Sequence, residues 1–161
     1  AHIFATSIYE NLRVAKASLT REEAVTSLQR AGLCEWIDSL PDGIDTVIGS
    51  GATTVSGGER RRLLMARALL VPAPVMAVDE ASEHLDGETA DRLMNTLLTR
   101  PPDRATLVVT HRLSALDQAD QVLVLGRVQA GQCARVVAQG THAHVLSCLP
   151  GYRWALDQEE Q

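Results

Sequence analysis

Two adjacent carboxylates follow a short apolar run in the middle of the chain. Residues 75–78 are Val, Met, Ala and Val, which predicts a buried strand, and Asp79 and Glu80 come directly after it. Ligands of α/β sheets bind beyond the carboxyl ends of the strands. A carboxylate there can hold Mg²⁺ beside a phosphate, and its neighbour can accept a proton from an attacking water. The same residues are also typical of an ordinary strand followed by an acidic helix cap.

A serine and two glycines precede a long helical pattern. Ser56, Gly57, Gly58 and Glu59 come immediately before apolar residues that recur at helical spacing. A hydroxyl group, free backbone amides and the positive end of a helix dipole together form an anion site. The alternative is a serine N-cap followed by flexible glycines, which is common in helices.

A histidine ends another apolar run. Residues 105–110 predict a second buried strand, and His111 follows it directly. A single histidine in such a place is more often packed than functional. It gains interest because it would share the strand-end face with Asp79 and Glu80.

The elements that must position these side chains alternate between helices and strands. Helices are expected at 7–14, 20–31, 33–40, 57–71, 87–99, 113–119, 141–147 and 152–158, and strands at 75–78, 105–110 and 121–125, with a hairpin within 127–138. This alternation indicates an α/β fold with a largely parallel sheet of fully buried strands. We therefore expect a helical subdomain over 1–73, an α/β subdomain over 74–147 and a C-terminal helix over 148–161.

The composition is that of a chain that can bury a core. It has 161 residues, 45% hydrophobic and 22% charged, with a net charge of −5. The acidic balance argues against a general nucleic-acid-binding protein, and no apolar stretch approaches the roughly 18–20 residues of a membrane span. Three widely spaced cysteines, Cys34, Cys133 and Cys148, predict reduced, packed thiols, with a metal site or a redox pair as the alternative.

The lysine content carries a separate conclusion. Lys16 is the only lysine among the 15 Lys and Arg residues, and no glycine-rich loop precedes it. A phosphate-binding loop of the GxxxxGKS/T type needs a lysine after glycines. Residues 1–161 therefore contain no such loop.

Taken in order, these features resemble the motifs of ABC-type ATPases. Residues 55–59 resemble the LSGGQ signature, with Val for Leu and Glu for Gln. Asp79 matches the Walker B aspartate, Glu80 the catalytic glutamate, Asp86 the D-loop aspartate and His111 the switch histidine. The resemblance implies a P-loop NTPase-type α/β core that lacks its Walker A part, with a helical subdomain that carries the signature.

Further segments resemble the exporter branch of that family. Residues 4–12 are similar to the segment after the Q-loop, which in exporters contacts the coupling helices of the membrane domain, and residues 40–51 resemble the lead-in to the X-loop. Residues 140–142 and 151–152 match the exporter tail. The D-loop form and the arginine-rich composition resemble actinobacterial relatives of the heterodimeric cysteine/glutathione exporter needed for cytochrome bd assembly.

The sequence departs from the family pattern in places. Ala81 and Ser82 replace the usual Pro-Thr after the catalytic glutamate, and Ser50 stands where exporters often have a glutamate. The Walker A loop, the aromatic loop that stacks on adenine and the Q-loop glutamine are expected upstream of Ala1.

The resemblance implies ATP and Mg²⁺ as cofactors. In that family two domains close head to tail, with ATP held between one P-loop and the signature of the partner. Ser56, Gly57, Gly58 and Glu59 would thus bind ATP that is held by a second ABC domain. In the chain's own site, Asp79 would organise Mg²⁺.

The remaining roles follow from the same resemblance. Glu80 would polarise the attacking water, His111 would steady the γ-phosphate, and Asp86 would signal across the interface between the two domains. We therefore expect the ATP-hydrolysing portion of an exporter, at the cytoplasmic face of the plasma (inner) membrane, that is inactive alone.

The partners implied are a second nucleotide-binding domain and membrane coupling helices, with no nucleic acid. The alternative is a truncated, catalytically silent module that only associates with a partner. A soluble ABC protein acting on DNA or ribosomes is disfavoured by the acidic charge and by the exporter-like segment 4–12.

Overall fold

The computed structural model describes residues 2–49, 54–82, 85–99, 104–126 and 133–159. The chain divides into two units, Ala1–Val109 and Thr110–Gln161, and each is described by itself. The subdomains expected at 1–73, 74–147 and 148–161 stay a prediction.

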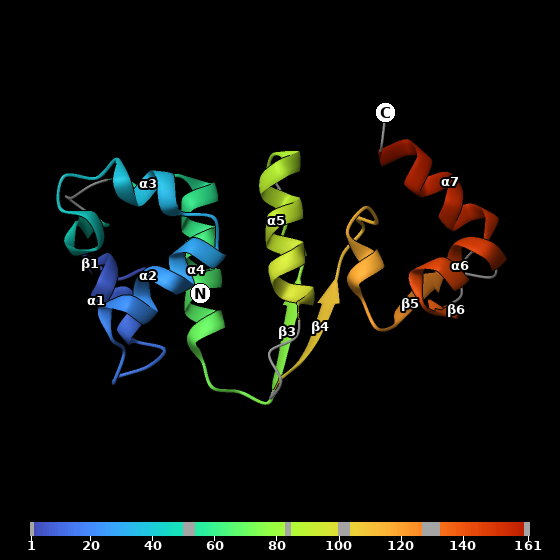
Figure 1. The fold of residues 1–161 in the computed structure, drawn as a ribbon, viewed down its shortest axis with the longest axis horizontal. Coiled ribbons are helices and arrows are strands. Elements are labelled where there is room, and N and C mark those ends of the chain that lie inside the picture. The colour runs from blue at the N-terminus through green and yellow to red at the C-terminus, as the bar shows by residue number, and fades with distance from the viewer. Residues whose placement is uncertain (1, 50–53, 83–84, 100–103, 127–132, 160–161) are drawn as a thin grey trace. The chain divides into compact units, whose positions relative to one another are not determined.

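Four helices make up the beginning of the first unit (Figure 1): α1 (Ile8–Arg13), α2 (Arg21–Arg30), α3 (Cys34–Asp38) and α4 (Gly57–Leu70). The sequence predicted all four, because their ends carry local signals. Thr20 and Ser56 cap α2 and α4, and each forms a complete capping box with the glutamate three residues on. Gly32 follows α2 with a φ of 70°, the left-handed conformation that commonly ends a helix.

These helices pack around a core of branched apolar side chains. The largest fully buried members are Ile8, Leu12, Leu28, Leu33, Ile48 and Leu63. A 3-10 helix, η1 (Gly43–Asp45), precedes strand β2 (Val47–Ile48), which pairs antiparallel with β1 (Thr6–Ser7). The sequence did not predict this pair, because strands of two residues are too short to show alternation.

The rest of the first unit is a parallel strand pair with a helix against it. Strands β3 (Val75–Asp79) and β4 (Ala105–Val109) lie side by side, and the chain crosses between them through α5 (Gly87–Leu98) (Figure 1). The helix buries the apolar stripe Ala90, Leu93, Met94 and Leu97. A parallel pair needs such a crossover, so the predicted α/β class is confirmed here.

The strands of this pair are half-buried, and the prediction of full burial was wrong. Met76 and Val78 are buried, whereas Val75, Leu107 and Val109 are 62%, 55% and 50% exposed. Side chains alternate between the two faces of a strand, so one face of the pair is covered and the other is open in this chain. An apolar run predicts that a strand can be buried on both faces but not whether both are covered.

The second unit is built on an antiparallel hairpin. Strand β5 (Val122–Gly126) pairs with β6 (Arg135–Gly140), with a register shift between Val124 and Leu125. The prediction of a parallel strand at 121–125 was therefore wrong in its pairing. The hairpin predicted within 127–138 instead uses β5 as its first arm, and residues 127–132 lie outside the described residues.

Short helices surround this hairpin in the sequence. Of the helix predicted over 113–119, the structure forms only the 3-10 turn η2 (Leu116–Gln118). The two predicted terminal helices are present as α6 (His142–Cys148) and α7 (Pro150–Glu159). Tyr152 of α7 is buried.

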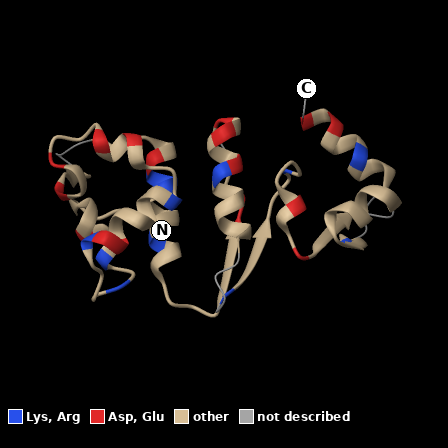
Figure 2. Ribbon diagram, viewed as in Figure 1, with Lys and Arg blue, Asp and Glu red and all other residues tan. Residues whose placement is uncertain are grey.

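Figure 2 shows acidic and basic residues close together on the helices of the first unit, where the pairs Arg13–Glu10, Lys16–Glu23 and Arg21–Asp45 form. Cys34, Cys133 and Cys148 are all exposed and free, so the predicted packing of the thiols was wrong.

Candidate functional site

The carboxyl end of β3 turns sharply. Asp79 is the last residue of the strand and lies opposite Val109 of β4, and the Glu80 N–H donates to the Val109 carbonyl over 2.9 Å. Glu80 has a φ of 48°, and among the described residues it is the one non-glycine residue with a positive φ. The left-handed conformation costs an L-residue about 1–2 kcal/mol. The backbone thus turns away from the strand direction immediately after Asp79.

The donor chemistry at this turn fits a magnesium ion. Asp79 is exposed and Glu80 is half-buried, so carboxylate oxygens, the ligands that Mg²⁺ prefers, lie at the strand end. Among the described residues no group of three or more His, Cys, Asp or Glu side chains could hold a metal by itself. Mg²⁺ usually keeps several waters and takes only one or two carboxylates beside substrate phosphates. This carboxylate pair therefore suits a magnesium–phosphate ligand better than a dedicated metal cage.

The start of α4 presents glycines to open space. A Cβ added at Gly57 or Gly58 would meet nothing within 4 Å, and neither residue has a positive φ. Packing and backbone conformation within the chain therefore do not explain why these two positions are glycine. A residue without a side chain does allow another molecule to approach the backbone closely.

The side chains around these glycines form the helix cap. Ser56 Oγ accepts the Glu59 N–H over 3.2 Å, and Glu59 Oε2 accepts the Ser56 N–H over 2.7 Å. Ser56 can cap the helix and also take part in an anion site, because its O–H can still donate. The Glu59 carboxylate adds a negative charge at the helix start that the glutamine of the LSGGQ pattern would not.

Asp86 acts as a helix cap. Its side chain accepts the Thr89 N–H over 3.0 Å at the start of α5. The pKa of Asp86 is lowered, first by this backbone N–H, then by the Thr89 side chain, with a smaller contribution from the positive charge of Arg62. Sequence reasoning missed this structural role, although aspartate before a helix is a common cap. Residues 83 and 84 of the predicted D-loop, like Ser50, lie outside the described residues.

His111 belongs to the second unit and is exposed. Directly after it, the Arg112 N–H donates to Thr110 Oγ1 over 3.0 Å. Asp79 and Glu80 belong to the first unit, so their meeting with His111 on one face stays a prediction.

Arginine side chains bind backbone carbonyls around α4. Arg62 Nη1 donates to the Gly32 carbonyl over 2.9 Å, and Arg67 Nη1 donates to the His2 carbonyl over 2.6 Å. At the other end of the helix, Arg104 donates to the carbonyls of residues 69, 71 and 73. Basic side chains near a helix C-terminus can satisfy its last carbonyls in this way. Sequence reasoning missed the contacts of all three arginines.

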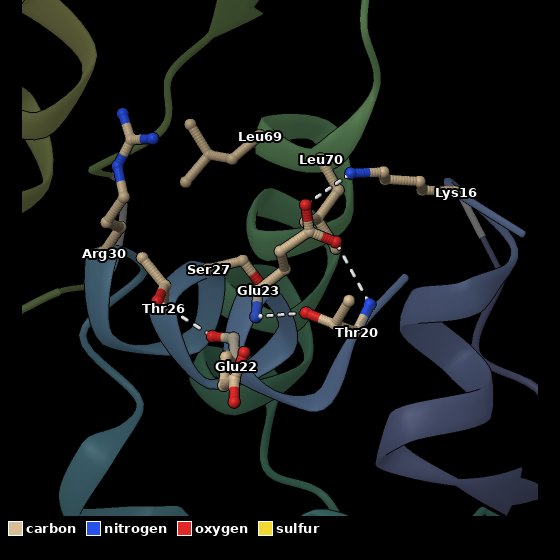
Figure 3. A pocket seen from close by; sticks show the side chains of 9 residues that line it. All are labelled: Lys16, Thr20, Glu22, Glu23, Thr26, Ser27, Arg30, Leu69 and Leu70. Carbon is tan, nitrogen blue, oxygen red and sulfur yellow. Dashed lines mark hydrogen bonds and ion pairs between the residues drawn. The ribbon is translucent and has the colours of Figure 1, made fainter. Parts of the chain in front are cut away.

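The described residues also form an open pocket of about 370 Å³ beside α2 (Figure 3). Lys16, the only lysine, lies in its wall and contacts Glu23 with Nζ 2.6 Å from Oε1. The other carboxylate oxygen of Glu23 accepts the Thr20 N–H over 3.0 Å. Because Lys16 is taken up by this pair at the capping box of α2, its position in the structure is that of a helix-stabilising residue.

No helix among the described residues combines the length and the apolar character needed to cross a membrane.

Comparisons with known proteins agree on one family. A family described as "ABC transporter" matches residues 3–83. The chain is 38% identical over 146 residues to an ATP-dependent lipid A-core flippase of Pseudoalteromonas atlantica, and 38% identical over 147 residues to that of Vibrio cholerae. These alignments cover 90% and 91% of the chain but 24% of each flippase, so the chain spans about a quarter of the length of these relatives.

A solved structure gives the same result. A bacterial Atm1-family ABC exporter with ATP bound superposes with a TM-score of 0.76 at 28% sequence identity. The match covers 99% of this chain and 27% of that exporter chain.

Proposed function

Since this chain belongs to the ABC transporter family, we propose that it is the ATP-binding and ATP-hydrolysing portion of an ABC exporter. It completes ATP sites in a head-to-tail pair of domains, and its partners are a second nucleotide-binding domain and the coupling helices of a membrane domain. Such a chain works at the cytoplasmic face of the inner membrane. The similarity to lipid A-core flippases and to an Atm1-family exporter supports the exporter branch. The finer resemblance to cysteine/glutathione exporters stays a prediction.

The observation that carries this proposal is the end of β3. The strand delivers Asp79 to the carboxyl edge of a parallel pair, and the left-handed turn at Glu80 redirects the next carboxylate. When bound, Mg²⁺ neutralises phosphate charge. Asp79 would hold that ion, Glu80 would accept a proton from the attacking water, and His111 would donate to the γ-phosphate oxygen.

The signature residues serve the partner's nucleotide. Ser56 donates its O–H, and the backbone amides of Gly57 and Gly58 approach the phosphate because no side chain stands over them. Glu59 keeps the cap of α4 in place, and Asp86 fixes the start of α5 next to the interface.

Catalysis of phosphoryl transfer consists mostly of positioning and charge stabilisation, for which a phosphate-binding loop is central. We therefore expect that the purified 161-residue chain neither binds ATP tightly nor hydrolyses it. Hydrolysis by this chain that Glu80→Gln abolishes would contradict the expectation.

A second experiment tests the signature directly. The chain is mixed with an intact exporter nucleotide-binding domain, and association is followed by analytical ultracentrifugation with and without ATP. We expect ATP-dependent association that Ser56→Ala weakens. The matched control is Thr141→Ala, which removes a similar helix cap from α6 but leaves the signature intact. Equal weakening by both variants, or no ATP dependence in the wild type, would contradict the proposal.

The alternative is a catalytically silent module that only associates with a partner. The two functions separate when the chain is joined to an upstream segment that supplies a GxxxxGKS/T loop. Loss of ATP hydrolysis on Glu80→Gln supports the hydrolysing portion, whereas unchanged hydrolysis supports the silent module.

A further inference from the structure

The N-terminal segment 2–7 is attached to α4 in two ways: Ile3 lies in the same apolar core as Leu63 and Ala66 of α4, and Arg67 binds the segment through polar contacts. Arg67 Nη1 donates to the His2 carbonyl over 2.6 Å, and its guanidinium lies 5.8 Å from the centre of the Phe4 ring. The rings of His2 and Phe4 also meet edge to face at 5.2 Å. Arg67 thus combines a charge-assisted hydrogen bond with a cation–π contact to the same segment.

Asn11 fixes the shape of this segment from the side of α1. The Asn11 side chain is fully buried, and its Oδ1 accepts the Phe4 N–H over 2.9 Å. Its Nδ2 donates to the carbonyls of Phe4 and Ser7, each over 3.0 Å. The amide therefore uses both its acceptor and its donor groups on backbone that lies four to seven residues earlier.

Strand β2 and the residues next to it form a third set of contacts with the segment. The Ile8 N–H donates to the Thr46 carbonyl over 3.1 Å, and β1 pairs with β2. Gly49 has a φ of 104°, and a Cβ there would lie 3.0 Å from the Ala5 Cα. Segment 2–7 is therefore held in one conformation, and Arg67 is its polar connection to α4, beside the packing of Ile3 in the core.

The geometry of α4 gives this connection a consequence. Arg67 lies ten residues beyond Gly57, which at 1.5 Å per residue is about 15 Å along the helix. The helix is continuous between the two positions, so a displacement of its first turn moves Arg67 as well. The contacts of Arg67 then transmit that displacement to residues 2–4.

We propose that Arg67 is a positioning residue that makes α4 and segment 2–7 one rigid body. A shift of the signature at Ser56–Gly58 on nucleotide-dependent association is thereby passed to segment 2–7. This inference rests on the proposed function for the signature. It adds the residue through which a movement of the signature reaches segment 2–7.

The first arm of the test uses the free 161-residue chain. Amide exchange measured by NMR should be about tenfold faster at Phe4 in Arg67→Met, the size expected for the loss of one hydrogen bond to a charged group. Exchange at the Ile8 amide, which donates to the Thr46 carbonyl, should not change. Arg30→Met, at another arginine of the same unit, is the matched control. Arg67→Lys keeps the charge and should lie between wild type and Arg67→Met, and it replaces that variant if Arg67→Met does not fold. Unchanged exchange at Phe4 would overturn the connection.

The second arm measures the same amides during ATP-dependent association with an intact exporter nucleotide-binding domain. In the wild type we expect exchange at residues 4–6 to change on association, and in Arg67→Met we expect association of equal affinity without that change. An equal change in both proteins would overturn the coupling. Absence of association in the wild type would contradict the proposed function and the coupling, whereas the first arm still decides whether Arg67 holds the segment.

Discussion

Glu80 is a residue whose side-chain chemistry and backbone conformation conflict. Its φ of 48° lies where L-residues other than Asn and Asp are rarely found, and its position is the one that the proposed chemistry needs. Strain of this kind is commonly stored at functional sites and is tolerated because the surrounding structure enforces it. Here the Val109 carbonyl holds the Glu80 N–H.

This strain is measurable with two variants that both remove the carboxylate. We expect Glu80→Gly to be more stable than Glu80→Ala by about 1 kcal/mol, because glycine adopts the left-handed conformation without a Cβ clash. The free energy of unfolding in urea provides the measurement. As a control, Ala77→Gly is compared with wild type, because Ala77 lies in the extended strand β3. Glycine there should instead destabilise the chain by about 0.5–1 kcal/mol. A Glu80→Gly variant less stable than Glu80→Ala would show that the strain is absent.

At the scale of elements, a carboxylate at the N-terminus of α2 makes the stability of the folded chain depend on pH. The pKa of Glu23 is lowered, first by its hydrogen bond from Lys16 and then by the backbone N–H of Thr20. Asp45 beside Arg21 is shifted in the same direction. A lowered folded-state pKa gives stabilisation that is complete above the ordinary pKa and is lost as the pH falls through the folded value.

We therefore expect the melting temperature of the chain to fall as the pH is lowered from 5 to 3. In Glu23→Gln the fall should be smaller, because glutamine does not titrate. At pH 7 the same variant should be less stable than wild type, because it lacks the ion pair with Lys16. Parallel curves for the two proteins across this pH range, followed by circular dichroism, would rule out the role given to Glu23.

The elements also explain what sequence reasoning could and could not predict. The bounds of α2 and α4 follow from their caps and from helical periodicity, so the sequence predicted them, and α5 was predicted although its Asp86 cap was missed. The pairing of β5 with β6 was missed, because an apolar run fits a parallel or an antiparallel neighbour equally well. Likewise, nothing local relates Arg67 to His2, which are 65 residues apart. Asp79 and Glu80 could be predicted as a strand-end pair, whereas the left-handed turn between strand and loop could not.

At the scale of the whole molecule, the open face of β3 and β4 should govern behaviour in solution. Parallel sheets normally have both faces covered, and contiguous exposed apolar surface promotes association. Val75, Leu107 and Val109 present such a face in the first unit.

We expect the isolated chain to bind a hydrophobic fluorescent dye and to scatter light on concentration. Leu107→Lys should reduce both signals while changing the free energy of unfolding by less than about 0.5 kcal/mol, because the side chain is more than half exposed. Leu93→Lys is the contrasting control, since Leu93 is buried and a charge there should unfold the chain. Dye fluorescence that Leu107→Lys leaves unaltered would assign the dye to another surface.

Lys16, which pairs with Glu23, is a unique site for chemical labelling of lysine. Because no other lysine is present, a reagent that acylates ε-amines has a single lysine target, and that target sits at the start of α2. Acylation removes the positive charge and with it the ion pair that supports the capping box. A probe attached there would therefore mark the helical part of the chain and at the same time loosen the helix that it reports on.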